Sequence, residues 1–207
     1  MLNIHPISKA SFILAAFALV TTGLVALTHL LTEDTIAQAQ ENAIQQTINQ
    51  LVPADMYNNA IAQDCIVKQD VNGENIRVFR ARFDEHPVAV VLESIAPNGY
   101  NGRIDLLVAI DTEQRILGVR TVKHTETPGL GDKIEIKKSN WITYFAGLSV
   151  TDDNQKNWAV RNDGGMFDAF TGATITPRAV VGAVKNTLVW AQEQDLFAQG
   201  QTCGEKQ

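Results

Sequence analysis

The chain has 207 residues, of which 45% are hydrophobic and 19% are charged, and its formal net charge is −6. This length allows one well-packed domain together with a membrane anchor, but not two large domains. The acidic balance and the lack of a lysine and arginine cluster argue against a nucleic-acid partner, because contacts to phosphates need a basic patch.

Residues 10–31 form an apolar run without a formal charge and predict a transmembrane helix. At about 1.5 Å per residue, a helix of this length crosses a hydrocarbon core of about 30 Å. The flanks of the run are asymmetric, because Lys9 precedes it, two acidic residues follow it, and the next basic residue is Lys68. The positive-inside rule therefore predicts residues 1–9 in the cytoplasm and the remainder of the chain across the membrane.

A cleavable signal peptide is the alternative interpretation of this segment. The tripeptide 37–39 (AQA) has the small-x-small form of a cleavage site, but it lies well beyond the apolar run and after two acidic residues. The length of the run favours an uncleaved anchor. We therefore expect a single-pass protein of a bacterial inner membrane, with a cytoplasmic N-terminus and a periplasmic C-terminal domain.

Beyond the anchor, residues 32–53 predict a helical stalk with an apolar stripe, and Pro53 ends it. Alternating or apolar runs then predict strands. These strands cover residues 76–83, 88–95, 104–110 and 116–122. The polar stretch 111–114 between the last two runs predicts a hairpin connection.

The C-terminal third of the chain changes to helical patterns. Residues 140–148 predict a short helix, and residues 177–199 predict a strong amphipathic helix. Thr176 suits the N-cap of the latter and Pro177 suits its first turn. Residues 54–207 are therefore expected to form one α+β domain, with a central, mostly antiparallel sheet and flanking helices.

The segment Asp168–Thr174 (DAFTGAT) stands just ahead of the last predicted helix. Gly172 lets the backbone turn sharply and lets a ligand approach closely. Free N–H groups and the positive dipole end at a helix start would suit a phosphate ester on Thr174. Asp168 would accept backbone N–H bonds from the loop, or help to bind a metal ion during attachment. Taken alone, such a loop is more often a turn and a helix cap.

The loop resembles the motif Asp-x-x-(Ser/Thr)-Gly-Ala-Thr of the FMN-binding subunits of the Rnf/Rsx electron-transport complex and the Na⁺-translocating NADH:quinone reductase. Residues 124–131 (HTETPGLG) resemble the family's His-x-Glu-Thr-Pro-Gly-Leu-Gly stretch, and residues 99–102 (GYNG) resemble its Gly-Tyr-x-Gly segment. Three motifs in this order behind one anchor helix cover nearly the whole chain. Pattern and length are most similar to the subunit designated G of the Rnf/Rsx complex.

This resemblance implies that FMN is bound covalently, through a phosphoester between its phosphate and the hydroxyl of Thr174. Thr171, Gly172 and Ala173 stand at matching positions of the motif, and Asp168 stands at its start. The other cofactor-binding residues that the resemblance implies are Tyr100, His124, Glu126, Thr127, Gly129, Leu130 and Gly131.

Some features of these motifs can be judged from the residues themselves. Pro128-Gly129 fits a type II turn in which Gly129 takes a positive φ. His124 is not expected to bind a metal, because no other His or Cys pairs with it at ligand spacing, and no metal site is predicted. Tyr100 is a candidate for stacking on the flavin. Tyr100 is nevertheless expected in the core or in interfaces rather than on the flavin, as are Trp141, Trp158 and Trp190.

Cys65 and Cys203 fit neither a zinc site nor a disulfide-dense scaffold. A disulfide between them is compatible with a compartment outside the cytoplasm. Sequence separation alone does not establish the required geometry, so the pairing stays open at this point.

The resemblance implies an electron-relay subunit of a membrane-bound, ion-translocating oxidoreductase. The chain has no dinucleotide fingerprint and no catalytic constellation, so no independent catalysis is expected and the cofactor supplies the chemistry. The implied partners are other subunits of the complex, membrane lipid and a flavin transferase that uses FAD and Mg²⁺. Two alternatives remain: a membrane-tethered binding domain without redox function, and a non-redox assembly subunit.

Overall fold

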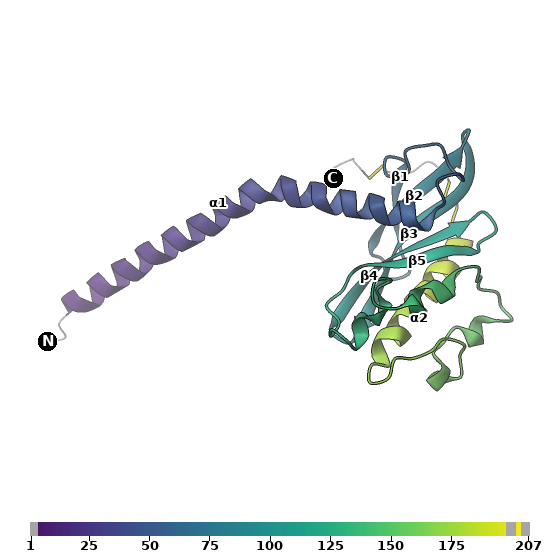
Figure 1. Ribbon diagram of the computed structural model, residues 1–207. Coiled ribbons are helices and arrows are strands. Elements are labelled where there is room, and N and C mark those ends of the chain that lie inside the picture. Colours follow the sequence, from purple (N-terminus) through teal and green to yellow (C-terminus); the bar gives the residue numbers. More distant parts are fainter. Residues whose placement is uncertain (1–3, 198–201, 204–207) are drawn as a thin grey trace. The chain divides into compact units, whose positions relative to one another are not determined.

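The structure is a computed structural model that describes residues 4–197 and 202–203. In this part of the chain one long helix is followed by five strands and a final α-helix, with short 3₁₀ helices before the last element (Figure 1). Internal contacts divide the chain into two units, Met1–Ile44 and Gln45–Gln207, and each is described by itself.

The first unit consists mostly of α1, which spans Ile4–Leu51. Its segment Ser8–Glu33 has a mean hydropathy of 2.2, with none of it buried, and is the one helix of the described chain long and apolar enough to cross a membrane. The hydroxyls of Thr21 and Thr28 donate to the carbonyls four residues back, at 2.9 and 3.0 Å. These bonds remove polar groups from the apolar surface, so the threonines do not interrupt the helix predicted over residues 10–31.

The last turns of α1 belong to the second unit. Ile48 and Leu51 are buried there, as is Val52 just beyond the helix. The helix ends at Leu51 because Val52 precedes Pro53, and the residue before a proline is disfavoured in the helical conformation. α1 therefore runs without interruption from the apolar segment through residues 32–51.

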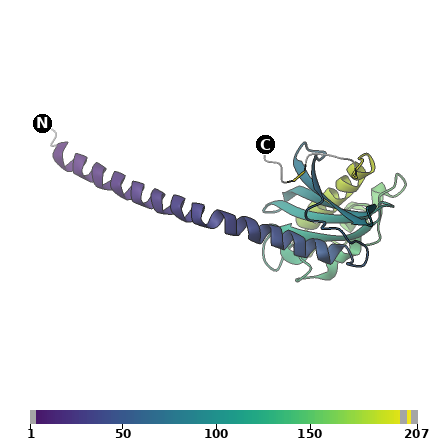
Figure 2. The same ribbon diagram turned by 90° about the horizontal axis from the view of Figure 1, so that it is seen from above.

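The second unit is built on an antiparallel sheet with the strand order β1-β2-β3-β4-β5 (Figures 1 and 2). The strands span Cys65–Gln69 (β1), Asn75–Phe83 (β2), His86–Gly99 (β3), Gly102–Asp111 (β4) and Ile116–Lys123 (β5). Each strand pairs with its neighbours in sequence, so the sheet is a meander. The α+β prediction with a mostly antiparallel sheet is confirmed, and so is the hairpin between β4 and β5. The edge strand β1 was not predicted, because CIVKQ is short and does not alternate.

Helices cover both faces of the sheet (Figures 1 and 2). One face packs against α2 (Ile175–Gln192), which crosses β3, and the buried side chains there form the main core. The last turns of α1 cover the other face, where Leu51 lies so close to β5 that a Cβ on Gly118 would be 2.9 Å from its Cδ2. Burial on both sides explains why β3 and β4 contain long apolar runs.

The segment between β5 and α2 contains four short 3₁₀ helices in the described chain. They span Gly131–Ile134, Asn140–Phe145, Gln155–Asn157 and Arg161–Asp163. The second corresponds to the short helix predicted over residues 140–148, and the hydroxyl of Ser139 caps it by accepting a bond from the Trp141 N–H at 3.0 Å. The three tryptophans are buried in the core, as expected.

The last helix differs from the prediction at both ends. It begins at Ile175 with Thr174 as its N-cap residue, so Thr176 is not the cap but a fully buried residue of the first turn. It ends at Gln192 and does not reach residue 199. Beyond the helix, Leu196 is buried in the core. The last residues of the predicted helix, 198–199, lie outside the described residues.

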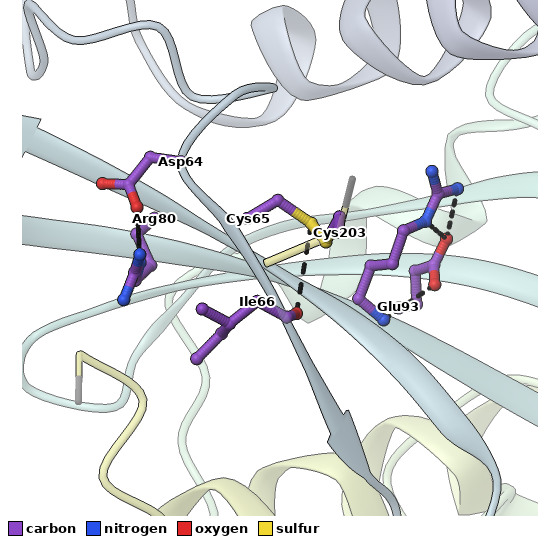
Figure 3. Close-up of a disulfide and its surroundings, with 7 residues drawn as sticks. Asp64, Cys65, Ile66, Arg80, Glu93 and Cys203 are labelled. Atoms are coloured by element: carbon purple, nitrogen blue, oxygen red, sulfur yellow. Dashed lines mark hydrogen bonds and ion pairs between the residues drawn. A yellow bond between two sulfur atoms is a disulfide. The ribbon is translucent and has the colours of Figure 1, made fainter. Parts of the chain in front are cut away.

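A disulfide joins Cys65 of β1 to Cys203, with a Cα–Cα distance of 5.5 Å (Figure 3). The N–H of Cys203 donates to the Cys65 carbonyl at 3.2 Å, and Thr202 forms a bridge with Ile66. Thr202 and Cys203 therefore pair with the edge strand β1. The pairing that the sequence left open is made, across a sequence separation of 138 residues.

We expect the Cys203→Ser substitution to lower the free energy of unfolding of the chain by about 2–5 kcal/mol, because a cross-link over a long loop mainly restricts the unfolded state. Urea unfolding of the detergent-purified chain, with and without dithiothreitol, measures this. The double variant Cys65→Ser, Cys203→Ser is the control, and its midpoint should not respond to reductant. An unchanged wild-type midpoint under reducing conditions would contradict the prediction.

Candidate functional site

A cavity of about 290 Å³ opens where the three sequence motifs meet. It is lined by Tyr100, Glu126, Thr127, Leu130, Gly131, Gly172, Ala173, Thr174, Ile175 and Thr176. All of these except Ile175 and Thr176 are residues that the sequence analysis named as cofactor-binding candidates. The fold brings together segments that are far apart in the chain.

The mouth of the cavity carries exposed apolar side chains. Tyr100 is 65% exposed, Ile175 is 44% exposed and Leu130 is 42% exposed. Each of these side chains comes from a different motif or its immediate neighbour. A cavity with apolar and aromatic side chains and a few polar groups is typical of sites that bind small organic molecules.

Leu130 is placed by the turn that the sequence predicted at Pro128-Gly129. The carbonyl of Thr127 accepts the N–H bonds of Leu130 and Gly131, each at 3.1 Å, and Gly129 has a φ of 77°. A residue other than glycine would be strained at this φ. Gly129 itself does not line the cavity.

Glu126 is a buried carboxylate in the cavity wall, with only 5% of the residue exposed. Its Oε1 accepts the backbone N–H of Asn101 at 3.1 Å, and its Oε2 accepts the hydroxyl of Thr176 at 2.5 Å. One carboxylate thus joins the β3–β4 turn, the segment after β5 and the first turn of α2. Asn101 is held further by its side-chain amide, which donates to the Thr125 carbonyl at 3.0 Å.

Two glycines leave room for this carboxylate. A Cβ on Gly131 would lie 2.7 Å from Glu126 Oε2 and 2.9 Å from the hydroxyl oxygen of Thr176. A Cβ on Gly99 would lie 2.7 Å from Glu126 Oε1. Such distances are too short for a real side chain, so the position of Glu126 excludes a side chain at Gly131. At Gly99 the backbone carbonyl of Gly102 lies closer still, at 2.3 Å, and excludes a side chain together with Glu126.

His124 supports Glu126 from outside the cavity. Its Nδ1 accepts the backbone N–H of Glu126 at 3.1 Å, so the ring proton stands on Nε2, which donates to Glu135 Oε1 at 2.9 Å. His124 therefore fixes the backbone of Glu126 and does not line the cavity. Among the described residues, no group of His, Cys, Asp and Glu is arranged to hold a metal ion.

The loop before α2 is a tight turn. The N–H of Ala173 donates to the Phe170 carbonyl at 3.0 Å, and Gly172 has a φ of 81°, as the third residue of a type II turn requires. The indole N–H of Trp141 donates to the Asp168 carbonyl at 2.8 Å and fixes the start of the loop. Thr171 is exposed and does not line the cavity.

Thr174 is the N-cap residue of α2, but its side chain makes no capping hydrogen bond. In the described chain, no acceptor lies within bonding distance of the N–H groups of Ile175 and Thr176, and Pro177 has none to donate. Two free N–H groups at the positive end of the helix dipole therefore adjoin a half-buried hydroxyl that is not committed elsewhere. This arrangement suits a phosphate.

The basic residues beside the loop are paired with carboxylates. Arg178 forms two bonds with Asp163, at 2.6 and 2.8 Å, and both its hydrogen bonds and its charge lower the pKa of the Asp163 carboxyl. Arg161 pairs with Asp168 at 3.0 Å, and both side chains are exposed. Among the described residues, the Asp168 carboxylate makes this ion pair and no hydrogen bond with a loop N–H group. Its expected part in holding the loop or in metal binding during attachment stays a prediction. An exposed pair of this kind contributes little to stability.

Sequence reasoning missed Asn101 and misjudged Thr176. Asn101 stands at the variable position of the Gly-Tyr-x-Gly segment, and it acts through its backbone N–H, which no residue type reveals. Thr176 matched the pattern of an N-cap. Its hydroxyl faces Glu126 instead, across a sequence separation of 50 residues.

Comparisons with known proteins match both parts of the chain. A family model described as "FMN-binding domain" matches residues 99–189, and one described as "RnfG N-terminal region" matches residues 1–51. The chain is similar to the subunit designated G of the ion-translocating oxidoreductase complex of Shewanella loihica, with 46% identity over 95% of this chain and 96% of that protein. The corresponding protein of Vibrio cholerae is 48% identical over 95% of this chain and 97% of its own length. That of Photorhabdus laumondii is 47% identical, over 93% and 94% respectively.

We expect Gly131→Ala to destabilise the protein by about 1–3 kcal/mol, because the new Cβ overlaps Glu126 and Thr176. Gly182→Ala in α2 is the matched control, since a Cβ there meets nothing within 4 Å. That control should gain about 0.5–1 kcal/mol from the better helix propensity of alanine. Urea unfolding of both variants measures the difference. Equal stabilities of the two variants would show that Glu126 does not fill the space beside Gly131.

Proposed function

Because this chain belongs to the RnfG family of ion-translocating oxidoreductase complex subunits, we propose that it relays electrons within such a complex through an FMN esterified to Thr174. The comparisons support an FMN-binding, electron-transferring subunit of a redox complex. The covalent link, the residues of the site and the orientation in the membrane are our proposal.

The observation that carries the proposal is the state of the Thr174 hydroxyl. It lines the cavity, it is partly exposed, and it makes no capping bond although it stands at the N-cap position. The neighbouring hydroxyl of Thr176 is buried and bonded to Glu126, and that of Thr171 lies outside the cavity. Thr174 is therefore the hydroxyl best placed to accept a phosphoryl group beside the helix start.

The residues around Thr174 fit the parts of FMN. The free N–H groups of Ile175 and Thr176 would bind the phosphate oxygens. The exposed side chains of Tyr100, Leu130 and Ile175 would contact the apolar isoalloxazine ring. The flavin supplies the redox chemistry when bound, because it can exchange one or two electrons. The chain itself has no nicotinamide-binding fingerprint, so electrons would come from another subunit.

The disulfide supports a periplasmic location of the domain. Disulfides persist in oxidising compartments such as the bacterial periplasm and are rare in the cytoplasm. Cys65 and Cys203 are both in the second unit and are joined. Lys9 on the other side of the apolar helix supports the same orientation. We therefore propose a single-pass inner-membrane subunit whose partners are membrane lipid, the other subunits and, during maturation, a flavin transferase.

The alternative is a tethered binding or assembly domain in which the Thr174 loop is only a turn and a helix cap. In a capping role, a first-turn N–H donates a hydrogen bond to the threonine oxygen. That bond is missing at Thr174, which favours a role for the hydroxyl in attachment.

Intact-mass measurement of the chain, co-expressed with its flavin transferase, should show a gain of one FMN minus water. Trypsin cuts after Arg161 and Arg178, so the peptide 162–178 contains Thr171, Thr174 and Thr176 together. Fragmentation of this peptide should place the added mass on Thr174. Thr174→Ala should abolish the gain, whereas Thr171→Ala, which removes the other exposed hydroxyl of the loop, should keep it.

Expression without the transferase should give the apoprotein and serves as the chemical control. In the assembled complex, Thr174→Ala should leave the subunits together but stop electron transfer. Electron transfer at the wild-type rate in this variant would contradict the relay hypothesis and favour the assembly role.

The proposed orientation can be measured in spheroplasts from which the outer membrane has been removed. Added protease should digest the domain after residue 45, while an epitope fused before residue 1 stays protected until the inner membrane is lysed. The intact mass should also retain residues 1–39, which a cleaved signal peptide would lose. Protection of the domain in unlysed spheroplasts would reverse the orientation.

A further inference from the structure

Glu126 has no cationic partner. In the described chain, no Lys, Arg or His side chain lies within ion-pair distance of its carboxylate, which is bonded only to the Asn101 N–H and the Thr176 hydroxyl. Both of these donors are neutral. The Nδ1 atom of His124 accepts the Glu126 N–H and therefore carries no proton that it could donate to the carboxylate.

Four basic side chains of the surrounding segments have contacts other than Glu126. Lys138 lies 3.7 Å from Asp132, and Lys133 lies over the ring of Phe170 at 6.0 Å. Arg161 and Arg178 pair with carboxylates of their own segment. Among the described residues, the Glu126 carboxylate is thus held by two neutral hydrogen-bond donors near the start of α2, without an ion pair.

A buried charge of this kind acts strongly on its surroundings. Charges interact more strongly in a protein interior than in water, because the effective dielectric constant is lower. Adding electrons to a group in the same cavity brings further negative charge toward a fixed carboxylate. The carboxylate therefore makes that reduction less favourable.

We propose that Glu126 sets the reduction potential of the flavin, and that its charge makes the reduced cofactor a stronger electron donor. The inference rests on the proposed function, since it requires FMN in this cavity. It assigns to Glu126 a role beyond holding the three motifs together. A purely structural role would change stability but not the potential of a flavin that is still bound.

The test compares Glu126→Gln with the wild-type protein, both loaded with FMN by co-expression. The amide keeps the size of the side chain and can satisfy both partners, because its oxygen accepts the Asn101 N–H and its NH₂ group donates to the Thr176 oxygen. Only the charge is removed. Glu135→Gln is the matched control, because it removes a charge on the far side of His124 and does not line the cavity.

Each protein is titrated with dithionite against a reference dye of known potential. Two electrons pass from dithionite, which is oxidised to sulfite, to the flavin, and the protons that the reduced flavin takes up come from water. We expect Glu126→Gln to shift the reduction equilibrium at least tenfold toward the reduced form, about 30 mV for a two-electron couple. Glu135→Gln should shift it by less than roughly threefold, because the interaction weakens with distance and screening.

The outcomes separate this inference from the proposed function. Wild-type protein without FMN on Thr174 would overturn the proposed function. Loaded Glu126→Gln with the wild-type potential, or with the same shift as Glu135→Gln, would overturn only the inference.

If Glu126→Gln does not load, Thr176→Val takes its place, since it removes one donor from the carboxylate and leaves the charge. Its flavin should then be harder to reduce than that of the wild type. A potential that is unchanged or higher in this variant would overturn the inference.

Discussion

The carboxylate of Glu126 is the point at which the site is held together. Burying a carboxylate is costly unless hydrogen bonds compensate the lost water, and here the two bonds come from segments 25 and 50 residues away in the sequence. Both hydrogen bonds of the carboxylate form only when the β3–β4 turn and the start of α2 both lie beside it. The cost of leaving it unsatisfied therefore enforces the geometry that puts Thr174 at the cavity.

The topology of the sheet brings these segments to one end. β3 and β4 are joined at Gly99–Gly102, and β5 runs antiparallel to β4, so that Lys123 pairs with Asp105 near the same end. The segment after β5 thus emerges beside the β3–β4 turn. α2 then packs across β3 with its first turn at this end, where the hydroxyl of Thr176 reaches Glu126. A simple meander and one crossing helix are enough to assemble the site.

The sequence predicted what depends on local pattern. Alternating or apolar runs and turn residues indicated β2 to β5, Pro128-Gly129 predicted a type II turn with a positive φ at Gly129, and Gly172 was expected at a sharp turn. What it could not predict depends on contacts between distant residues. Thr176 has the local pattern of a cap but is used by Glu126, and the pairing of Cys65 with Cys203 is set by the edge of the sheet. The partner of the Asp168 carboxylate, Arg161, likewise follows from tertiary structure.

The same charges suggest why a covalent link would be useful here. Binding sites for free phosphates commonly use arginine forks, but Arg161 and Arg178 beside this loop already pair with Asp168 and Asp163. A phosphate at the start of α2 would find backbone N–H groups and the helix dipole, and it would also lie in the cavity of the Glu126 carboxylate. Like charges in one cavity weaken reversible binding of an anion. A phosphoester would remove that difficulty, because it would hold the cofactor without depending on the electrostatic affinity of the site. The carboxylate could then remain beside the proposed flavin.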